Sequence, residues 1–145
     1  MEWHQDGYII TTDKSRIDIG TVHQFLVSSY WAAGIPRETV ERSIKGSLCF
    51  IILHGEKQVG FARVITDEAS FAYLTDVFVL EAYRGKGLSK WLMEVIIHYP
   101  ALQGLRRFLL ATRDAHGLYA LYGFAPLMNA DTWMQIHQPD VYKKG

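Results

Sequence analysis

Short apolar runs rich in β-branched residues predict the strands of this chain. Residues 7–12, with the sequence GYIITT, form the first such run. We expect three further strands in succession, at residues 47–53, 58–66 and 71–80. The sequences HGEK and DEAS separate these runs and are typical of tight turns between antiparallel strands. The third run is apolar on both faces except at Thr75 and Asp76, which indicates a central place in the sheet.

The spacing of apolar residues also predicts a first helix after residue 18. Ile19, Val22, Leu26 and Tyr30 recur at intervals of three or four residues, so they share one helical face. Asp18 is placed to cap the amino end of this helix. Gly and Pro residues at positions 34 and 36 interrupt the pattern and separate it from the next helix.

Two more helices are predicted further along the chain. Pro36 favours the first turn of a helix that extends to about Lys45. A stronger amphipathic pattern follows two glycines and stops before Pro100. Its apolar residues are Leu88, Trp91, Leu92, Val95, Ile96 and Tyr99.

The remaining residues complete the predicted fold. We expect a strand at 106–113, a short helix at 114–122 and two closing strands at 123–127 and 132–137. The element order is then β-αα-βββ-α-β-α-ββ, an α/β (α+β) fold with one mixed, mostly antiparallel sheet. The crossover from the strand at 71–80 to the strand at 106–113 should make these two strands parallel. A chain of 145 residues has the length of one domain, so we assign residues 1–145 to a single domain.

The composition and net charge limit the classes of function that this chain can have. Fifteen basic and fifteen acidic residues give no net charge, which argues against a general nucleic-acid-binding surface. No apolar run is long enough to span a membrane, and the N-terminal sequence MEWHQDG lacks the features of a signal peptide. Cys49 is the one cysteine and lies in an apolar run, so we expect it to be buried and the protein to be cytoplasmic. The six histidines lack the spacing of metal ligands, so no metal is expected.

The sequence VLEAYRGKGLSK, residues 79–90, places two glycines between a predicted strand and a predicted helix. The first amides of a helix lack internal partners and carry partial positive charge, and glycine allows a phosphate to approach them. Arg84, Lys86 and Lys90 add positive charge, so we expect a pyrophosphate site. The alternative is that the glycines only form a tight turn. The P-loop pattern and the dinucleotide pattern GxGxxG are both incomplete here.

This segment resembles the acyl-CoA-binding motif R/Q-x-x-G-x-G/A of the GNAT superfamily, the Gcn5-related N-acetyltransferases. Arg84 and Gly87 match the motif, and Ser89 replaces the usual Gly or Ala. Downstream, AHGLYALYGFAP resembles the C-terminal signature of the family. The matching residues are Leu118, Tyr119, Gly123 and Phe124. Both motifs stand in the family's order, and the predicted strand order fits its fold.

The resemblance implies acetyl-CoA as the cofactor. In the family, a central pair of parallel strands splays apart around the pantetheine arm. This implies that the backbone of Val77, Phe78 and Val79 holds that arm, and that one of these amides polarises the thioester carbonyl. The implied pyrophosphate-binding residues are Arg84, Gly85, Lys86, Gly87, Leu88 and Ser89. The sequence does not decide which residue contacts the 3′-phosphate. The candidates are Arg84, Lys86 and Lys90.

The resemblance also implies direct attack of an amine on the thioester. Tyr119 occupies the position of the family's general acid, and the alternative is a tyrosine that only packs under the sheet. Asp76 is the candidate base, because it is a charged residue in an apolar strand. The alternative for Asp76 is an ion pair or hydrogen bond with Arg63, Arg113 or Thr75.

The acceptor is expected near the first two helices, which wall this site in many members of the superfamily. Tyr30 and Trp31 lie there, and they either contact an amine through their rings or pack in the core. The implied function is an N-acetyltransferase acting on a small-molecule amine or an exposed amino group, with no nucleic acid or membrane as partner. The competing function is a non-catalytic acyl-CoA-binding sensor or partner module. The family often dimerises, and the aromatic C-terminal strands are a candidate homodimer interface.

Overall fold

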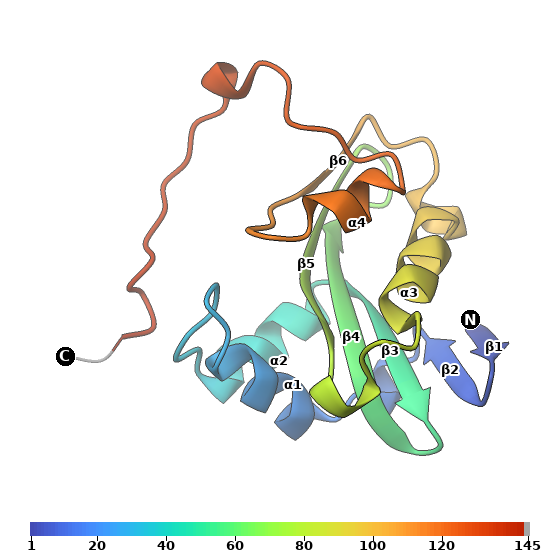
Figure 1. Cartoon of the computed structure of the whole chain (residues 1–145). Coiled ribbons are helices and arrows are strands. Elements are labelled where there is room, and N and C mark those ends of the chain that lie inside the picture. Colours follow the sequence, from blue (N-terminus) through green and yellow to red (C-terminus); the bar gives the residue numbers. More distant parts are fainter. Residues whose placement is uncertain (144–145) are drawn as a thin grey trace.

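One mixed sheet of six strands organises the protein in the computed structural model, which describes residues 1–143 (Figure 1). The strands lie in the order of the sequence. They are β1 (Glu2–Gln5), β2 (Tyr8–Thr11), β3 (Leu48–His54), β4 (Lys57–Thr66), β5 (Phe71–Val79) and β6 (Arg107–Leu110). All neighbours are antiparallel except β5 and β6, which are parallel as predicted. The pair lies at one edge of this sheet, because β6 is its last strand.

The helices lie on both faces of the sheet (Figure 1). They are α1 (Ile19–Val27), α2 (Arg37–Lys45), α3 (Leu88–Ile97) and α4 (His116–Ala120). The predicted cap of α1 is confirmed, since the Asp18 carboxylate accepts from the amide of Thr21 at 3.2 Å. The helix ends sooner than predicted. The hydroxyls of Ser28 and Ser29 donate to the carbonyls of Phe25 and Leu26, which competes with a further helical turn.

Two separate apolar cores result from this arrangement. Helix α3 packs on one face of the sheet, where Leu92 and Ile96 lie in one core with residues of β3, β4 and β5. Helices α1 and α2 cover the other face, where Val22 and Val40 belong to the second core. Cys49 is fully buried in this second core, as predicted. The sheet is thus covered on both sides, as its apolar strands require.

The N-terminus and the C-terminus differ from the predicted element order. An additional strand, β1, forms a hairpin with β2 through Asp6 and Gly7, whose φ angles are 51° and 83°. Positive φ at both central residues is the hairpin turn that Asp-Gly favours, so this signal was present in the sequence.

The two closing strands predicted at 123–127 and 132–137 are wrong for this structure, because no strand is assigned between residues 123 and 143. The chain there turns at η4 (Ala130–Thr132) and extends away from the sheet (Figure 1). Among the described residues, no helix has both the length and the apolar character needed to cross a bilayer.

Candidate functional site

The parallel strands β5 and β6 pair along only part of their length. Their register runs from Phe71 opposite Arg107 to Leu74 opposite Leu110, where β6 ends. Strand β5 continues to Val79. Within residues 1–143, its backbone from Thr75 onward therefore has no strand neighbour on this side. A stretch of extended backbone is left available for a ligand to pair with it.

A bulge bends β5 at the same place. Phe61 of β4 pairs with Phe78, but Arg63 pairs with Thr75, so β5 carries one extra residue opposite β4. Asp76 lies in this bulge with φ of 54°, a conformation that residues other than glycine seldom adopt. Bulges occur often beside active sites, because they redirect strands and side chains.

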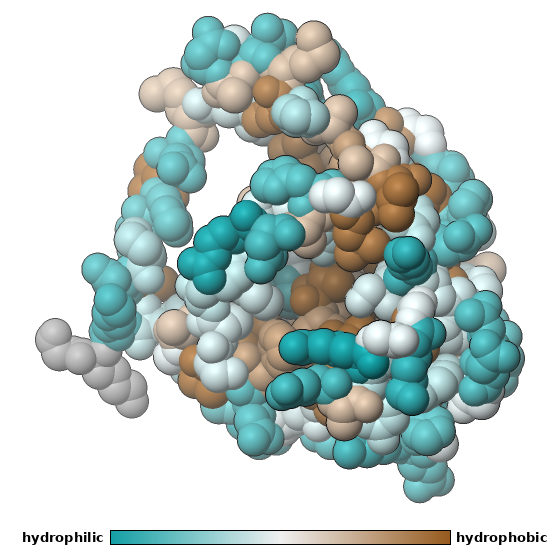
Figure 2. All heavy atoms as spheres, viewed as in Figure 1, coloured by the Kyte–Doolittle hydropathy of each residue, from teal (hydrophilic) through white to brown (hydrophobic). Residues whose placement is uncertain are grey.

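A cavity of about 770 Å³ opens where the two strands separate. It gathers side chains from β5, the end of β6, the loop after α1, the glycine turn, α4 and the C-terminal segment. Among the lining residues are Tyr30, Trp31, Asp76, Val77, Phe78, Val79, Arg84, Ser89, Arg113, Asp114, Tyr119 and His137. Figure 2 shows apolar side chains at the bottom of a hollow that hydrophilic residues surround.

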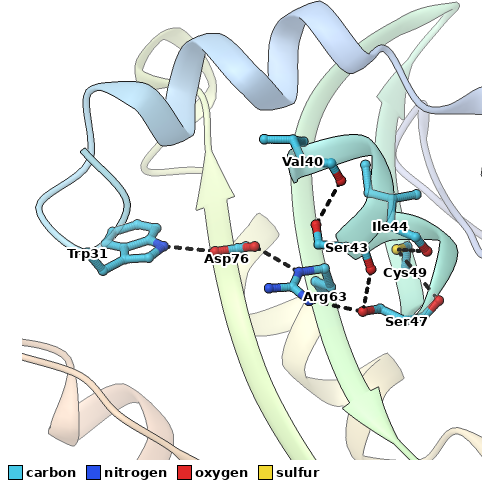
Figure 3. Close-up of polar contacts among 8 residues, drawn as sticks. All are labelled: Trp31, Val40, Ser43, Ile44, Ser47, Cys49, Arg63 and Asp76. Atoms are coloured by element: carbon cyan, nitrogen blue, oxygen red, sulfur yellow. Dashed lines mark hydrogen bonds and ion pairs between the residues drawn. The ribbon is translucent and has the colours of Figure 1, made fainter. Parts of the chain in front are cut away.

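Asp76 is held from two sides (Figure 3). Its Oδ1 accepts from the indole Nε1 of Trp31, and its Oδ2 accepts from Nε of Arg63, each at 2.8 Å. The residue is 7% exposed, and Arg63 balances its charge. Of the two interpretations of Asp76, the structure contains the ion pair with Arg63. Each oxygen of the carboxylate thus accepts one hydrogen bond, and the side chain is held in place from both sides.

The ion pair continues into α2 (Figure 3). Arg63 Nη1 donates to the hydroxyl of Ser47 at 3.0 Å, and that hydroxyl donates to the carbonyl of Ser43 at 2.7 Å. This network connects the end of α2, through β4, to the bulge in β5. Every polar side-chain atom buried in the described part of the chain has a hydrogen-bond partner. The bulge is thus supported by a complete set of contacts.

Tyr30 and Trp31 form one wall of the cavity. Their rings meet edge to face with centroids 5.0 Å apart. The guanidinium carbon of Arg113 lies 3.7 Å from the centroid of the Tyr30 ring, and the amide of Arg113 donates to the Tyr30 hydroxyl at 3.3 Å. Tyr30 is 51% exposed and Trp31 40%, so both rings present surface to a ligand. The wall is joined to the end of β6 by these contacts.

Tyr119 lies on α4 and is partly buried at the cavity. Its ring meets that of Phe124 edge to face, 6.1 Å apart. Burial, with lesser contributions from Tyr30 and Asp114, raises the pKa of Tyr119 above its ordinary value of 10.0. The phenol therefore keeps its proton at neutral pH and can donate it.

The glycine turn positions the amino end of α3. Gly85 and Gly87 both have φ of 78°, and a Cβ at either position would meet no atom within 4 Å. Their conformation therefore requires glycine, whereas the space around them does not. Gly87 caps α3 without a side-chain hydrogen bond, so within residues 1–143 the first amides of α3 have no side-chain partner. The guanidinium of Arg84 folds back and donates from Nε to the carbonyl of Val79 at 2.9 Å.

Most of the predicted site residues come together at this cavity. The exceptions lie in the glycine turn, where Gly85, Lys86, Gly87 and Leu88 do not line it. Leu88 is buried in the core with α3, so only its backbone is available. Gly87 and Lys90 border a second hollow of about 820 Å³, beside Trp91 and Tyr122.

Arg113, Asp114 and His137 are among the lining residues that were not predicted as site residues. The first two lie in the sequence ATRDAH directly after β6. The end of a predicted parallel strand is a signal that could have identified them, since ligands often bind there. His137 follows an extended segment far from the other site residues in sequence, and no local pattern marks it. Among the described residues, no group of three His, Cys, Asp or Glu side chains could hold a metal ion.

Residues 20–124 match the profile of the Acetyltransferase (GNAT) family. A protein of Gibberella zeae named "Putative acetyltransferase FG08082" is 29% identical over an alignment 142 positions long, and the match covers 82% of this chain and 79% of that protein.

Two solved structures have the same fold. A Xanthomonas campestris pv. campestris crystal structure, titled "putative acetyltransferase belonging to the gnat family", is 48% identical and superposes with a TM-score of 0.94. The match covers 97% of this chain and 100% of that one. A GNAT family acetyltransferase of Elizabethkingia anophelis, crystallised with acetyl-CoA bound, matches with a TM-score of 0.63 at 14% identity. That match covers 83% of this chain and 78% of the other.

Proposed function

The chain belongs to the GNAT acetyltransferase family, and we propose that it transfers an acetyl group from acetyl-CoA to a primary amine. The acceptor is a small molecule or an exposed amino group. The observation that carries the proposal is the separation of β5 from β6 beyond Leu74 and Leu110. It leaves extended backbone beside a cavity that also contains a tyrosine able to donate a proton. The glycine turn lies at the far end of the same strand.

The residues present fit acetyl-CoA. The backbone of Val77, Phe78 and Val79 would hold the pantetheine arm in the manner of an added strand. The amides of residues 84–89 would bind the pyrophosphate, because those that begin α3 have no side-chain partner and carry the positive end of the helix dipole. The Elizabethkingia anophelis protein, which has this fold, was crystallised with acetyl-CoA bound.

When bound, acetyl-CoA supplies an activated acyl group as a thioester. An amide of β5 would hydrogen-bond the carbonyl oxygen and stabilise the negative charge that develops on it during attack. Tyr119 would donate its phenolic proton to the departing sulfur as the carbon–sulfur bond breaks. A carbon–nitrogen bond forms in the same exchange, and the amine loses a proton. The raised pKa of Tyr119 suits this role, since a phenolate could not donate.

The proton of the amine needs an acceptor. An alkyl ammonium with a pKa of about 10 is not a nucleophile at neutral pH. Asp76 is held by hydrogen bonds from Trp31 and Arg63, which suits a positioning role better than that of the base. Asp114 and His137 also line the cavity. We assign proton removal to water beside Asp114 and His137, and we assign to Asp76 the positioning of Trp31.

Tyr30 and Trp31 would contact the acceptor. Aromatic faces attract an ammonium group, and both rings are partly exposed at the cavity. Arg113 already covers the Tyr30 ring. The face of Trp31 is therefore the better candidate for the acceptor amine.

Ligand-dependent stabilisation tests the cofactor. Acetyl-CoA and CoA should each raise the melting temperature, by about 5–10 °C at roughly 100 times the dissociation constant, while ATP and NADH should not. Release of free thiol from acetyl-CoA with a panel of amines then tests catalysis. Stabilisation without thiol release from any amine would favour the non-catalytic acyl-CoA-binding module. No stabilisation by either CoA compound would refute the cofactor assignment.

A further inference from the structure

Arg113 is a charged residue of the cavity to which the acetyl transfer described above gives no role. It follows the end of β6 and lines the cavity together with Tyr30 and Trp31. Its backbone amide donates to the Tyr30 hydroxyl at 3.3 Å, but within residues 1–143 no hydrogen bond or ion pair occupies its guanidinium. The side chain is exposed, so its positive charge is available to a ligand.

The Tyr30 ring holds this guanidinium in place without using its hydrogen-bond donors. The guanidinium carbon lies 3.7 Å from the ring centroid, which is a stacking distance. Stacking covers the flat face of the guanidinium, whereas its five N–H groups lie in the plane and point outward. The bond from the Arg113 amide to the Tyr30 hydroxyl joins the same two residues a second time. The cation is thus positioned before any ligand arrives, which lowers the entropy cost of binding one.

The other charged groups of the cavity differ in whether they have partners. Asp76 is in its ion pair, and Arg84 donates to a backbone carbonyl of β5. Asp114 also lines the cavity and is exposed, and within residues 1–143 its carboxylate has neither a hydrogen bond nor an ion pair. Arg113 and Asp114 are adjacent in the chain, yet they do not pair with each other. The cavity therefore presents one positive and one negative charge that are both available to a ligand.

We propose that the acceptor is an amino acid, whose carboxylate binds Arg113 and whose primary amine lies at Trp31. The proposal rests on the proposed acetyl transfer and narrows its class of acceptor. The fork of a guanidinium matches the two oxygens of a carboxylate. The indole N–H of Trp31 points at Asp76, so the exposed ring face is left for an ammonium group (Figure 3). Asp114 would attract the same ammonium group.

The charges favour a carboxylate over other groups that an amine could carry. A phosphate monoester has a charge of about −2 at neutral pH, and Asp114 beside Arg113 would repel the second charge. An amine without an anionic group would leave Arg113 unpaired in the occupied cavity. The amino groups of a lysine within a protein or of a peptide N-terminus are attached to a residue whose carboxyl is a neutral amide. A free amino acid satisfies both charges.

The carboxylate would bind the acceptor but take no part in the exchange of bonds. The amine nitrogen forms a bond to the acetyl carbon as the carbon–sulfur bond breaks, the sulfur takes a proton from Tyr119, and the amine gives its proton to water. The product is an N-acetyl amino acid, which keeps the negative charge and has lost the positive one. Its attraction to the face of Trp31 and to Asp114 is lost with that charge, which favours release of the product.

Comparison of amino acids with their amides tests the proposal. A series of straight-chain amino acids of increasing length is assayed by thiol release, each beside its carboxamide, which keeps the amine but lacks the negative charge. For the best acid of the series, kcat/KM should exceed that of its amide by roughly tenfold or more. Arg113→Gln should abolish this preference, mainly by raising the KM of the acid. Arg113→Lys should retain part of it, because the charge stays but the fork is lost.

Two controls separate carboxylate binding from other roles of Arg113. Arg42→Gln removes the same charge from an exposed position on α2 and should keep the preference for the acid. The KM for acetyl-CoA should be unchanged in every variant. If Arg113 only supported the Tyr30 ring, Arg113→Gln would lower kcat/KM equally for the acid and its amide, which would overturn the proposal. Equal kcat/KM for acid and amide in the wild-type protein would overturn it too.

A binding measurement distinguishes failure of this proposal from failure of acetyl transfer. If no amine releases thiol, the proposed acetyl transfer fails, and saturation-transfer NMR of the CoA-loaded protein with the same acids and amides then decides the carboxylate site. Binding of an acid that its amide does not share, and that Arg113→Gln loses, would support the site. Equal binding of acid and amide, or of neither, would overturn it.

Discussion

The indole of Trp31 donates to the carboxylate of Asp76 at 2.8 Å, and this bond joins the loop after α1 to the bulge in β5. The two residues belong to different parts of the candidate site. Trp31 lies where the acceptor is proposed to bind, and Asp76 directly precedes the strand residues proposed to hold acetyl-CoA. The contact therefore fixes the distance between the two halves of the site.

Replacing Asp76 should lower stability by removing the counter-ion of Arg63. In Asp76→Asn, the amide can still accept from Trp31, but Arg63 is left 15% exposed without a negative partner. Breaking such a pair costs about 3 kcal/mol, which is a fall in melting temperature of roughly 6–12 °C. Thermal denaturation measures the change. An unchanged melting temperature would mean that the ion pair contributes nothing.

The double variant Asp76→Asn/Arg63→Met distinguishes a loss of folding stability from a loss of catalytic activity. Removing both charges should restore much of the lost stability, because no buried charge stays unpaired. If Asp76 only positions Trp31, activity should recover together with stability. A stable double variant that is inactive at every pH would instead identify Asp76 as the proton acceptor.

Removing the Trp31 hydrogen bond should weaken acceptor binding. Trp31→Phe keeps an aromatic ring but loses the donor to Asp76, so the ring is held less firmly. A lost hydrogen bond of about 1 kcal/mol corresponds to a roughly fivefold higher KM for the amine. The KM for acetyl-CoA should stay the same. Tyr30→Phe is the control, because it loses only the hydroxyl contact with the Arg113 amide. Equal effects on both substrates in Trp31→Phe would contradict a local role in acceptor binding.

Gly87→Ala should impair CoA binding through backbone conformation. The φ of 78° at this position disfavours alanine by about 1–2 kcal/mol, although a Cβ would meet no atom. Gly104→Ala is a matched control, since Gly104 has φ of 74° and the same open surroundings but lies away from the glycine turn, between α3 and β6. Both variants should lose similar stability. Isothermal titration should show weaker CoA binding, by roughly tenfold, for Gly87→Ala alone. Normal CoA binding by that variant would exclude the glycine turn from the cofactor site.

Tyr119→Phe should slow turnover while CoA binding is retained. Loss of a positioned proton donor typically costs about a hundredfold in kcat. Burial raises the pKa of Tyr119 above 10.0, so the wild-type rate should fall only above that pH as the phenol ionises. This alkaline limb should be absent from the variant. Tyr122→Phe, which loses a bond to the carbonyl of Lys90, should keep normal turnover. Equal turnover by Tyr119→Phe and the wild type would remove Tyr119 from the mechanism.

Cys49 should make the protein less stable as the pH rises above 9. Burial raises the pKa of its thiol from 9.0 to about 11. Between these values the unfolded chain releases a proton that the folded chain keeps, so rising pH favours unfolding. The free energy of unfolding should fall by up to about 1.4 kcal/mol per pH unit relative to Cys49→Ala. Urea denaturation of both proteins from pH 8 to about pH 11 measures the difference. Parallel pH dependence would show that the folded thiol ionises normally.

The local elements were the most predictable part of this protein. Asp18 caps α1 as its sequence position indicates, and the amphipathic pattern that starts at Leu88 matches the start of α3. The parallel arrangement of β5 and β6 followed from the helical crossover that connects them. Each of these features depends on side chains close together in sequence, or on a general rule of chain connection.

The parts that escaped prediction depend on contacts distant in sequence. Arg63 was among the expected partners of Asp76, but no pattern near residue 76 predicts the bulge there or the hydrogen bond from Trp31. The segment 132–137 has the composition of a strand, yet whether it forms one depends on an available sheet edge. His137 lines the cavity only because the long segment that follows α4 leads the chain back to it. The sequence pattern predicts the individual strands and helices, whereas contacts between residues distant in sequence determine which of them pack together.

The half-paired strand β5 also has a consequence for selectivity between acyl donors. On the side that faces β6, the hydrogen-bonding groups of β5 are occupied over Phe71–Leu74, whereas Val77–Val79, beyond the bulge at Asp76, have no strand neighbour there among residues 1–143. With acetyl-CoA bound as proposed, the amides of its pantetheine arm would pair with this backbone and contribute to its recognition. Simple thioesters have no such amides, so we expect the protein to discriminate against them at binding, before any chemical step.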